Sequence, residues 1–169
     1  NGSYTYNLNT SSYTQADWGV YNKISNGGNQ AGLWRTLTED EWDYVITRDY
    51  RLRSRGTVNN VYGLILLPDN WELPEGLSFS SNQDNWFTNT YTRAEWTKMS
   101  DAGAVFLPCA NHRIGTTYYS DDIGCYWSAT RYNSANVYRM SFDSYSSSPS
   151  IGSVERYFGY SVRLVQDIE

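Results

Sequence analysis

The sequence predicts an α+β domain in which two helices pack on short antiparallel strands. Two segments begin with a helix capping box, which is a typical start signal for an α-helix. The second half of the chain alternates apolar and polar residues with the period of two that is typical of strands. Turn-forming residues separate these short runs. The chain has 169 residues, enough for one domain with a sizeable core, and we therefore expect residues 1–169 to form a single domain.

Both helices are predicted from their first turns. The first capping box runs from Thr38 to Glu41 and the second from Thr92 to Glu95. In each box the threonine hydroxyl accepts a helix N–H and the glutamate reaches back to the start of the helix. Apolar residues follow at helical spacing, namely Trp42, Val45 and Ile46 in the first segment and Trp96 and Met99 in the second. This spacing predicts helices near 39–48 and 93–101.

The strands are predicted from alternation, from buried apolar runs and from the residues that stop them. Asn59 and Asn60 are typical of a tight hairpin turn, and Pro68 and Pro108 end the apolar runs that precede them. The expected strands lie near 51–55, 61–67, 104–107, 126–130, 138–142 and 160–165. On the strand at 138–142 we expect Tyr138, Met140 and Phe142 to face the core, and Arg139, Ser141 and Asp143 to point outward.

The composition excludes several classes of protein. Aromatic residues make up 17% of the chain, which excludes disorder as the main state. The longest apolar run, Gly63 to Pro68, is far shorter than a membrane-spanning helix, so we expect no membrane insertion. A net charge of -5 disfavours binding to nucleic acid. The chain begins at Asn1 without a methionine or a signal-like segment, and we expect a C-terminal piece of a longer protein.

The two cysteines lie close together in the sequence. Cys109 and Cys125 flank one short stretch, and the single histidine, His112, gives them too few partners for a metal site. We therefore expect a Cys109–Cys125 disulfide, with two free thiols as the alternative. A disulfide favours an exported protein, so we expect an extracellular or cell-surface location.

Residues for catalysis are sparse. Cys109 and His112 could form a nucleophile–base pair, but a polar loop histidine beside a structural cystine explains them better. Asp121 and Asp122 could bind a hard cation, although adjacent carboxylates without regular spacing are more typical of a solvated loop. The sequence therefore predicts a protein that is not an enzyme, with no catalytic residue, no metal and no cofactor.

The segment 131–160 has the composition of a recognition surface. Tyr, Ser, Asn and Gly account for 17 of its 30 residues, and these four types dominate antibody binding loops. Exposed tyrosine and arginine on a stable sheet are also typical of interface hot spots. The alternative is a Ser-rich surface loop whose tyrosines pack in the core, and we expect this for Tyr126 and Tyr138. The predicted ligand-binding residues are Tyr118, Tyr119, Asp121, Tyr132, Asn136, Arg139, Asp143, Tyr145, Glu155, Tyr157 and Phe158. We expect one contiguous exposed surface, with Tyr118 and Tyr119 at its edge, formed by Tyr132, Arg139, Asp143, Tyr145, Tyr157 and Phe158.

Several motifs together resemble a known bacterial family. They are Trp34-Arg35-Thr36-Leu37-Thr38 with Glu41-Trp42, Gly63-Leu64-Ile65-Leu66-Leu67-Pro68-Asp69-Asn70-Trp71, Gly103-Ala104-Val105-Phe106-Leu107-Pro108, Tyr126-Trp127-Ser128-Ala129-Thr130 and Gly159-Tyr160-Ser161-Val162-Arg163-Leu164-Val165. The family contains bacterial surface domains related to formylglycine-generating enzymes, close to the major paralogous domain of Fibrobacter, in its gut Bacteroidetes branch. The resemblance runs from about Asp17 to Val165.

The resemblance implies a C-type lectin-like fold and a surface or secreted protein. The family is similar to variable proteins of diversity-generating retroelements, which include phage receptor-binding proteins and pilus-tip adhesins. In those proteins, fixed framework strands display side chains that vary through adenine-directed mutation. The implied partners are a protein or glycan ligand on another cell and the rest of a longer surface protein or pilus. The implied location is a bacterial cell surface or a phage particle.

Two features of the family are absent from this sequence. Cys109 and Cys125 do not match the motif of the reactive cysteine pair that the copper-dependent enzymes use. The calcium motifs of carbohydrate-binding C-type lectins are also missing, since Asn82-Gln83-Asp84-Asn85-Trp86 is only loosely similar to one of them. A non-enzymatic recognition domain is therefore the leading hypothesis. A formylglycine-generating-type oxidase and a structural surface-fibre module without its own ligand are the alternatives.

Overall fold

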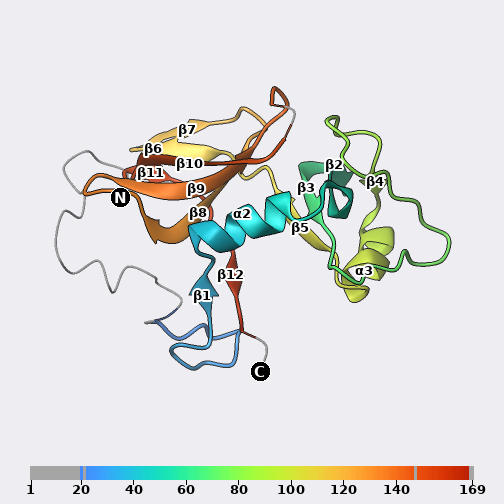
Figure 1. The fold of residues 1–169 in the computed structure, drawn as a ribbon, viewed down its shortest axis with the longest axis horizontal. Coiled ribbons are helices and arrows are strands. Elements are labelled where there is room, and N and C mark those ends of the chain that lie inside the picture. The colour runs from blue at the N-terminus through green and yellow to red at the C-terminus, as the bar shows by residue number, and fades with distance from the viewer. Residues whose placement is uncertain (1–19, 21, 147, 168–169) are drawn as a thin grey trace.

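The chain forms two helices and several small sheets, as the computed structural model shows for residues 20, 22–146 and 148–167 (Figure 1). The helices are α2 (Glu39–Thr47) and α3 (Arg93–Asp101), with a 3-10 turn at Tyr50–Leu52. The strands are β1 (Arg35–Thr36), β2 (Arg53–Val58), β3 (Val61–Leu66), β4 (Thr90–Tyr91), β5 (Val105–Pro108), β6 (His112–Ile114), β7 (Thr117–Tyr119), β8 (Gly124–Arg131), β9 (Asn136–Phe142), β10 (Ser150–Glu155), β11 (Phe158–Gly159) and β12 (Leu164–Val165). The predicted α+β class is confirmed.

The strands form four sheets, and nearly all neighbours are antiparallel. The largest has the order β4-β2-β3-β5, with the β2–β4 pair parallel. The others have the orders β10-β9-β8, β11-β6-β7 and β1-β12. Asn59 and Asn60 both have positive φ, at 49° and 66°, as expected for the tight turn of the β2–β3 hairpin.

Both predicted capping boxes are present. Thr38 Oγ1 accepts from the N–H of Glu41, and Thr92 Oγ1 accepts from the N–H of Glu95. The helices serve separate cores. The apolar face of α2 packs on β8, β9 and β10, in a core that includes Trp42, Ile46, Tyr126, Met140 and Phe142. The buried side of α3 contributes Met99 to a second core with Ile65, Leu67, Tyr91 and Ala104.

A single extended segment joins two of the sheets. Gly159, in β11, is paired with β6, and two residues later Ser161 forms a parallel bridge with Tyr126 of β8. The N–H of Trp127 donates to Ser161 O at 2.9 Å, and the N–H of Ser161 donates to Cys125 O at 3.0 Å. The sheet of β8 to β10 therefore continues, through this segment, into the hairpin of β6 and β7.

The structure also departs from the expected element boundaries. The stretch between the cysteines, interpreted as a loop, contains the β6–β7 hairpin, which turns at Gly115 with φ of 60°. Strand β10 lies in the Ser-rich segment and pairs with β9. The predicted strand near 160–165 is broken into the bridge at Ser161 and the short β12, because the chain changes partner from β8 to β1. Neither helix in the described part of the chain has the length and apolar character needed to cross a membrane.

Candidate functional site: an aromatic row across the C-terminal strands

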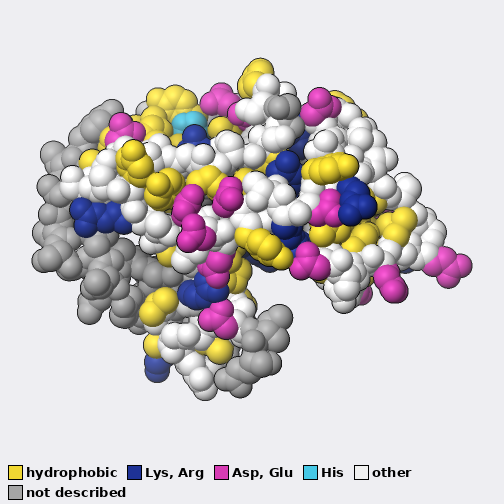
Figure 2. Space-filling view, viewed as in Figure 1, with side chains coloured by type: hydrophobic (Ala, Val, Ile, Leu, Met, Phe, Trp, Pro, Cys, Tyr) yellow, Lys and Arg dark blue, Asp and Glu magenta, His cyan; other side chains and the backbone are white. Residues whose placement is uncertain are grey.

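Two aromatic side chains face each other across the β6–β7 hairpin. His112 and Tyr119 are cross-strand partners, and their rings are stacked with centroids 4.9 Å apart and planes 4° from parallel. Figure 2 shows the imidazole of His112, the one histidine of the chain, at the surface among hydrophobic side chains. His112, expected to be a polar loop residue beside a cystine, lies instead in β6 and within an aromatic cluster.

Tyr160 connects this pair to the neighbouring sheet. Its ring centroid lies 5.8 Å from His112, 5.4 Å from Phe158 and 4.8 Å from Trp127. The guanidinium of Arg139 lies over the same ring, 5.9 Å from the centroid. We call these six residues the aromatic row: Tyr119, His112, Phe158, Tyr160, Trp127 and Arg139.

The backbone register explains why these side chains meet. Arg139 on β9 is opposite Trp127 on β8 and Gly152 on β10. Paired residues point to the same face of a sheet, and alternate residues point to opposite faces. Met140, next to Arg139, faces α2, so Arg139 and Trp127 must face away from the helix. Gly152 has no side chain, and a Cβ built there would touch nothing within 4 Å, so this end of the row is open.

The row is partly accessible to solvent. Tyr119 is 38% exposed, and the other five members are half-buried. The expectation that Ser141 points into solvent is wrong, because its side chain is 7% exposed. Arg139 is likewise half-buried, and its guanidinium donates to the Ser141 hydroxyl. The alternation pattern places Ser141 on the outward face of β9, but Arg139 and the ring of Tyr160 cover this face. Ser141 is therefore buried.

Four more predicted ligand residues lie around the turn of the β8–β9 hairpin, where the neighbouring strand β10 also ends. Asn136 is paired with Glu155, and Arg156 donates to Asn133 O at 2.8 Å, which ties the two turns together. Tyr132, 54% exposed, packs edge-on against Tyr138 with ring centroids 5.3 Å apart. We call this group the hairpin tip: Tyr132, Asn136, Glu155 and Tyr157. Tyr157 stacks on Phe158 at 4.9 Å and so extends the aromatic row, whereas Tyr132 packs on Tyr138, which lies on the Met140 side of β9.

Asp143 and Tyr145 lie elsewhere. They follow the other end of β9, and seven strand residues separate them from the turn of Tyr132, a separation of roughly 20 Å. Asp143 Oδ1 accepts from the N–H groups of Tyr145 and Ser146. Burial opposes ionisation of Asp143, but these hydrogen bonds hold its pKa below the usual value. Tyr145 is 88% exposed. The structure therefore does not bring all the predicted residues into one contiguous surface.

Tyr118 and Asp121 flank the row on the β7 side. Tyr118 alternates with Tyr119 and points to the opposite face of the strand. It is 51% exposed, lies beneath the guanidinium of Arg113 at 5.6 Å, and accepts a hydrogen bond from Asn111 Nδ2. The exposed Asp121 donates its N–H to Asn111 Oδ1. Asn111 thus orders this loop.

The predicted disulfide is wrong, because Cys109 and Cys125 are both free thiols. The Cys109 N–H donates to Tyr62 O. Cys125 lies within β8, between Ser141 of β9 and Ser161, whose N–H donates to Cys125 O. Cys109 thus follows the end of β5, whereas Cys125 lies in a strand of another sheet. Burial raises the pKa of Cys109 to about 12 and that of Cys125 to about 11.

The described residues offer no group of three or more His, Cys, Asp or Glu side chains that could hold a metal ion. The comparisons with family models, with curated proteins and with solved structures give no match for the chain.

Proposed function

We propose that this chain is a non-enzymatic ligand-recognition domain that binds through the aromatic row and the hairpin tip. The observation that carries the proposal is a connected set of partly exposed aromatic rings on a hydrogen-bonded sheet. Such rings contribute a large contact area and lose little side-chain entropy on binding, because their neighbours already hold them. Arg139 adds a planar cation at one end of the row.

We further propose a C-type lectin-like fold, as the family motifs imply. Tyr126-Trp127-Ser128 lies in β8, and Gly159-Tyr160-Ser161 is the segment that joins the two sheets. Both motifs thus supply framework backbone, while Tyr132 and Tyr157 occupy the turns between framework strands. This division supports the hypothesis of a variable protein of a diversity-generating retroelement, an adhesin or a phage receptor-binding protein. The ligand is then a protein or glycan on another cell, and the domain acts outside the cell.

The chemistry of the thiols supports recognition over the oxidase alternative. A cysteine that attacks a substrate as a nucleophile reacts as the thiolate. Cys125 is buried and Cys109 is half-buried, and this burial raises the pKa of each thiol well above neutral pH, so neither is an activated nucleophile in the metal-free protein. Copper-dependent oxygen consumption with a cysteine-containing sulfatase peptide would contradict the proposal.

A binding screen with matched variants tests the proposed surface. The purified domain is applied to a glycan array and to a panel of intact bacterial cells. Tyr119→Ala and Tyr132→Ala each remove an exposed ring from the proposed surface, and Tyr50→Ala removes a ring of similar exposure, 59%, beside α2. We expect the first two to lose binding and the third to keep it. Equal binding by all three variants would contradict the proposal.

A further inference from the structure

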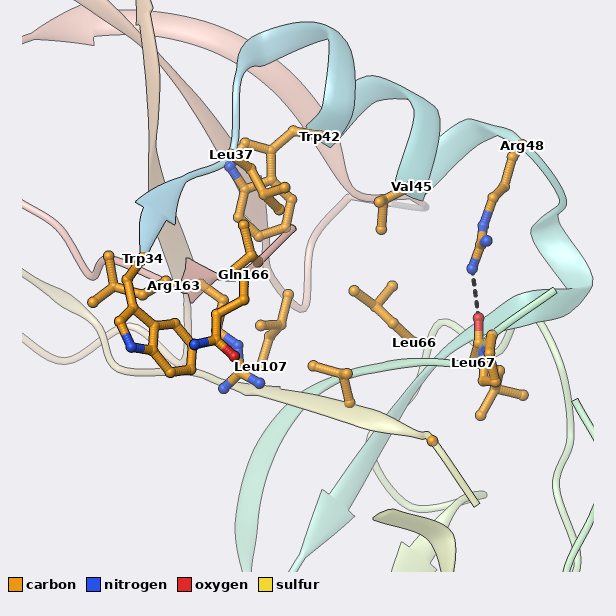
Figure 3. Close-up of a pocket in the computed structure, with 15 residues that line it drawn as sticks. Trp34, Leu37, Trp42, Val45, Arg48, Leu66, Leu67, Leu107, Arg163 and Gln166 are labelled. Atoms are coloured by element: carbon orange, nitrogen blue, oxygen red, sulfur yellow. Dashed lines mark hydrogen bonds between the residues drawn. The ribbon is translucent and has the colours of Figure 1, made fainter. Parts of the chain in front are cut away.

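A second concave site lies on the other side of the sheet from the aromatic row, between α2 and the four-stranded sheet. This cleft has a volume of about 470 Å³, within the range of small-molecule sites. Figure 3 shows Trp42 and Val45 of α2 along one wall and Leu66 and Leu107 along the opposite wall. The lining from both walls is apolar, and the cleft is elongated.

The two ends of the cleft carry its polar groups. Trp34, Arg163 and Gln166 gather at one end, and Arg48 stands at the other (Figure 3). Arg48 already has partners, because it forms an ion pair with Asp69 at 2.5 Å and donates to Leu67 O. Arg163 is exposed, and none of the ion pairs in the described part of the chain involves it.

The charge of the lining is opposite to that of the chain. The chain carries a net charge of -5, yet both charged residues that line the cleft are arginines. An anionic group at the Arg163 end would find a free guanidinium and the amide of Gln166. A guanidinium matches a carboxylate with two parallel hydrogen bonds. An apolar chain attached to that carboxylate would lie between the two apolar walls.

The wall that carries Arg163 is held in place. Strand β12 follows this residue and pairs with β1. On β1, Arg35 binds Glu41 at 2.6 Å and Asp167 at 2.7 Å, so it ties the chain on both sides of the cleft together. The cleft is therefore formed before a ligand arrives, which lowers the entropy cost of binding.

We propose that this cleft binds an aliphatic monocarboxylate. Its carboxylate binds Arg163, and its aliphatic tail lies between α2 and the strands β3 and β5. The site is separate from the recognition surface of the aromatic row. The two sites are therefore expected to respond to different substitutions.

Isothermal titration calorimetry with sodium decanoate, below the concentration at which it forms micelles, tests the proposal. We expect saturable binding to the wild-type chain, and weaker binding of decanol because it lacks the charge. Arg163→Gln should weaken decanoate binding about tenfold or more, since a hydrogen bond to a charged group is lost. Arg93→Gln is the matched control, because Arg93 is an exposed arginine at the start of α3, and should bind as the wild type does.

A variant that fills the cleft tests where the aliphatic tail of the ligand lies. Val45→Phe adds a ring to the α2 wall and should abolish decanoate binding. Leu164→Phe, on the β12 wall, provides a second filled cleft if the first variant is unstable by circular dichroism. Binding by a folded filled variant as tight as that of the wild type would overturn the proposal. Equal affinity for decanol and decanoate, or no saturable binding to the wild-type chain, would overturn it as well.

Discussion

The imidazole of His112 stacks on the ring of Tyr119 with centroids 4.9 Å apart, and it also contacts Phe158 at 5.9 Å and Tyr160 at 5.8 Å. His112 thus packs the β6–β7 hairpin on Phe158 and Tyr160, in addition to the backbone pairing of β6 with β11. Aromatic pairs each contribute about 0.5–1.5 kcal/mol beyond area burial. The ring contacts of His112 therefore help to hold the aromatic row in position.

His112→Ala should reduce the free energy of unfolding by about 2 kcal/mol, because it removes three ring contacts. His112→Phe keeps a flat ring and should recover most of the loss. Urea unfolding of the two variants measures the difference. A loss in His112→Ala no larger than that in Tyr50→Ala, which removes a peripheral ring, would show that the stack has no structural role.

Acid should weaken the ion pairs by which Arg35 holds Glu41 of α2 and Asp167, which follows β12. The hydrogen bond from Arg35 lowers the pKa of Glu41 from 4.5 to about 2, and hydrogen bonds from Thr38 add to this effect. Because the folded-state pKa is depressed, the stabilisation is present above pH 4.5 and is lost as the pH falls from 4.5 toward 2. We expect the melting temperature of the wild-type chain to fall more steeply over this window than that of Glu41→Gln. Parallel curves would contradict the role of Glu41.

The two thiols should react slowly in the native protein. Burial raises the pKa of both Cys109 and Cys125, and alkylation needs the thiolate. At pH 8 we expect iodoacetamide to modify neither thiol quickly in buffer and both quickly in guanidinium chloride. Intact mass of the unreduced protein provides the check, since a disulfide there would contradict the free thiols of the structure.

A buried arginine joins two loops near the far end of β9. Arg55, 3% exposed, donates to Asp84 O and Ser146 O and lies over the ring of Trp86 at 5.4 Å. Arg55→Met should reduce the free energy of unfolding by about 2–3 kcal/mol, because two part-buried hydrogen bonds to carbonyl oxygens and the contact with the Trp86 ring are lost. Arg51→Met is the control, since the Arg51 side chain is 72% exposed. Equal losses in the two variants would contradict this role.

Local signals in the sequence predict the helices and the first hairpin well. Each capping box involves residues only three positions apart, and the turn at Asn59 and Asn60 is set by backbone conformations that asparagine tolerates. Such features depend on neighbours in the chain, so the pattern is sufficient. Alternation also placed Met140 and Phe142 correctly in the core.

The recognition surface was harder to predict, because it depends on pairing between distant strands. The expectation of a disulfide favours a loop between Cys109 and Cys125, so the β6–β7 hairpin in this stretch was not predicted. The signal for that hairpin was Gly115, flanked by the aromatic and β-branched residues of 117–119. Trp127 and Tyr160 were missed as site residues because their meeting depends on the parallel bridge at Ser161, and no local pattern specifies that register.

The central claim is that ligands bind across the aromatic row and the hairpin tip. Hydroxyl-radical footprinting measures this most directly, with the domain free and bound to the cells or glycan identified in the binding screen. We predict that the ligand protects Tyr119, Tyr132 and Phe158 from oxidation. Tyr44, in α2, and Tyr50, in the 3-10 turn after it, should react as they do in the free protein. Protection confined to Tyr44 and Tyr50, with the aromatic row as reactive as in the free protein, would contradict the account.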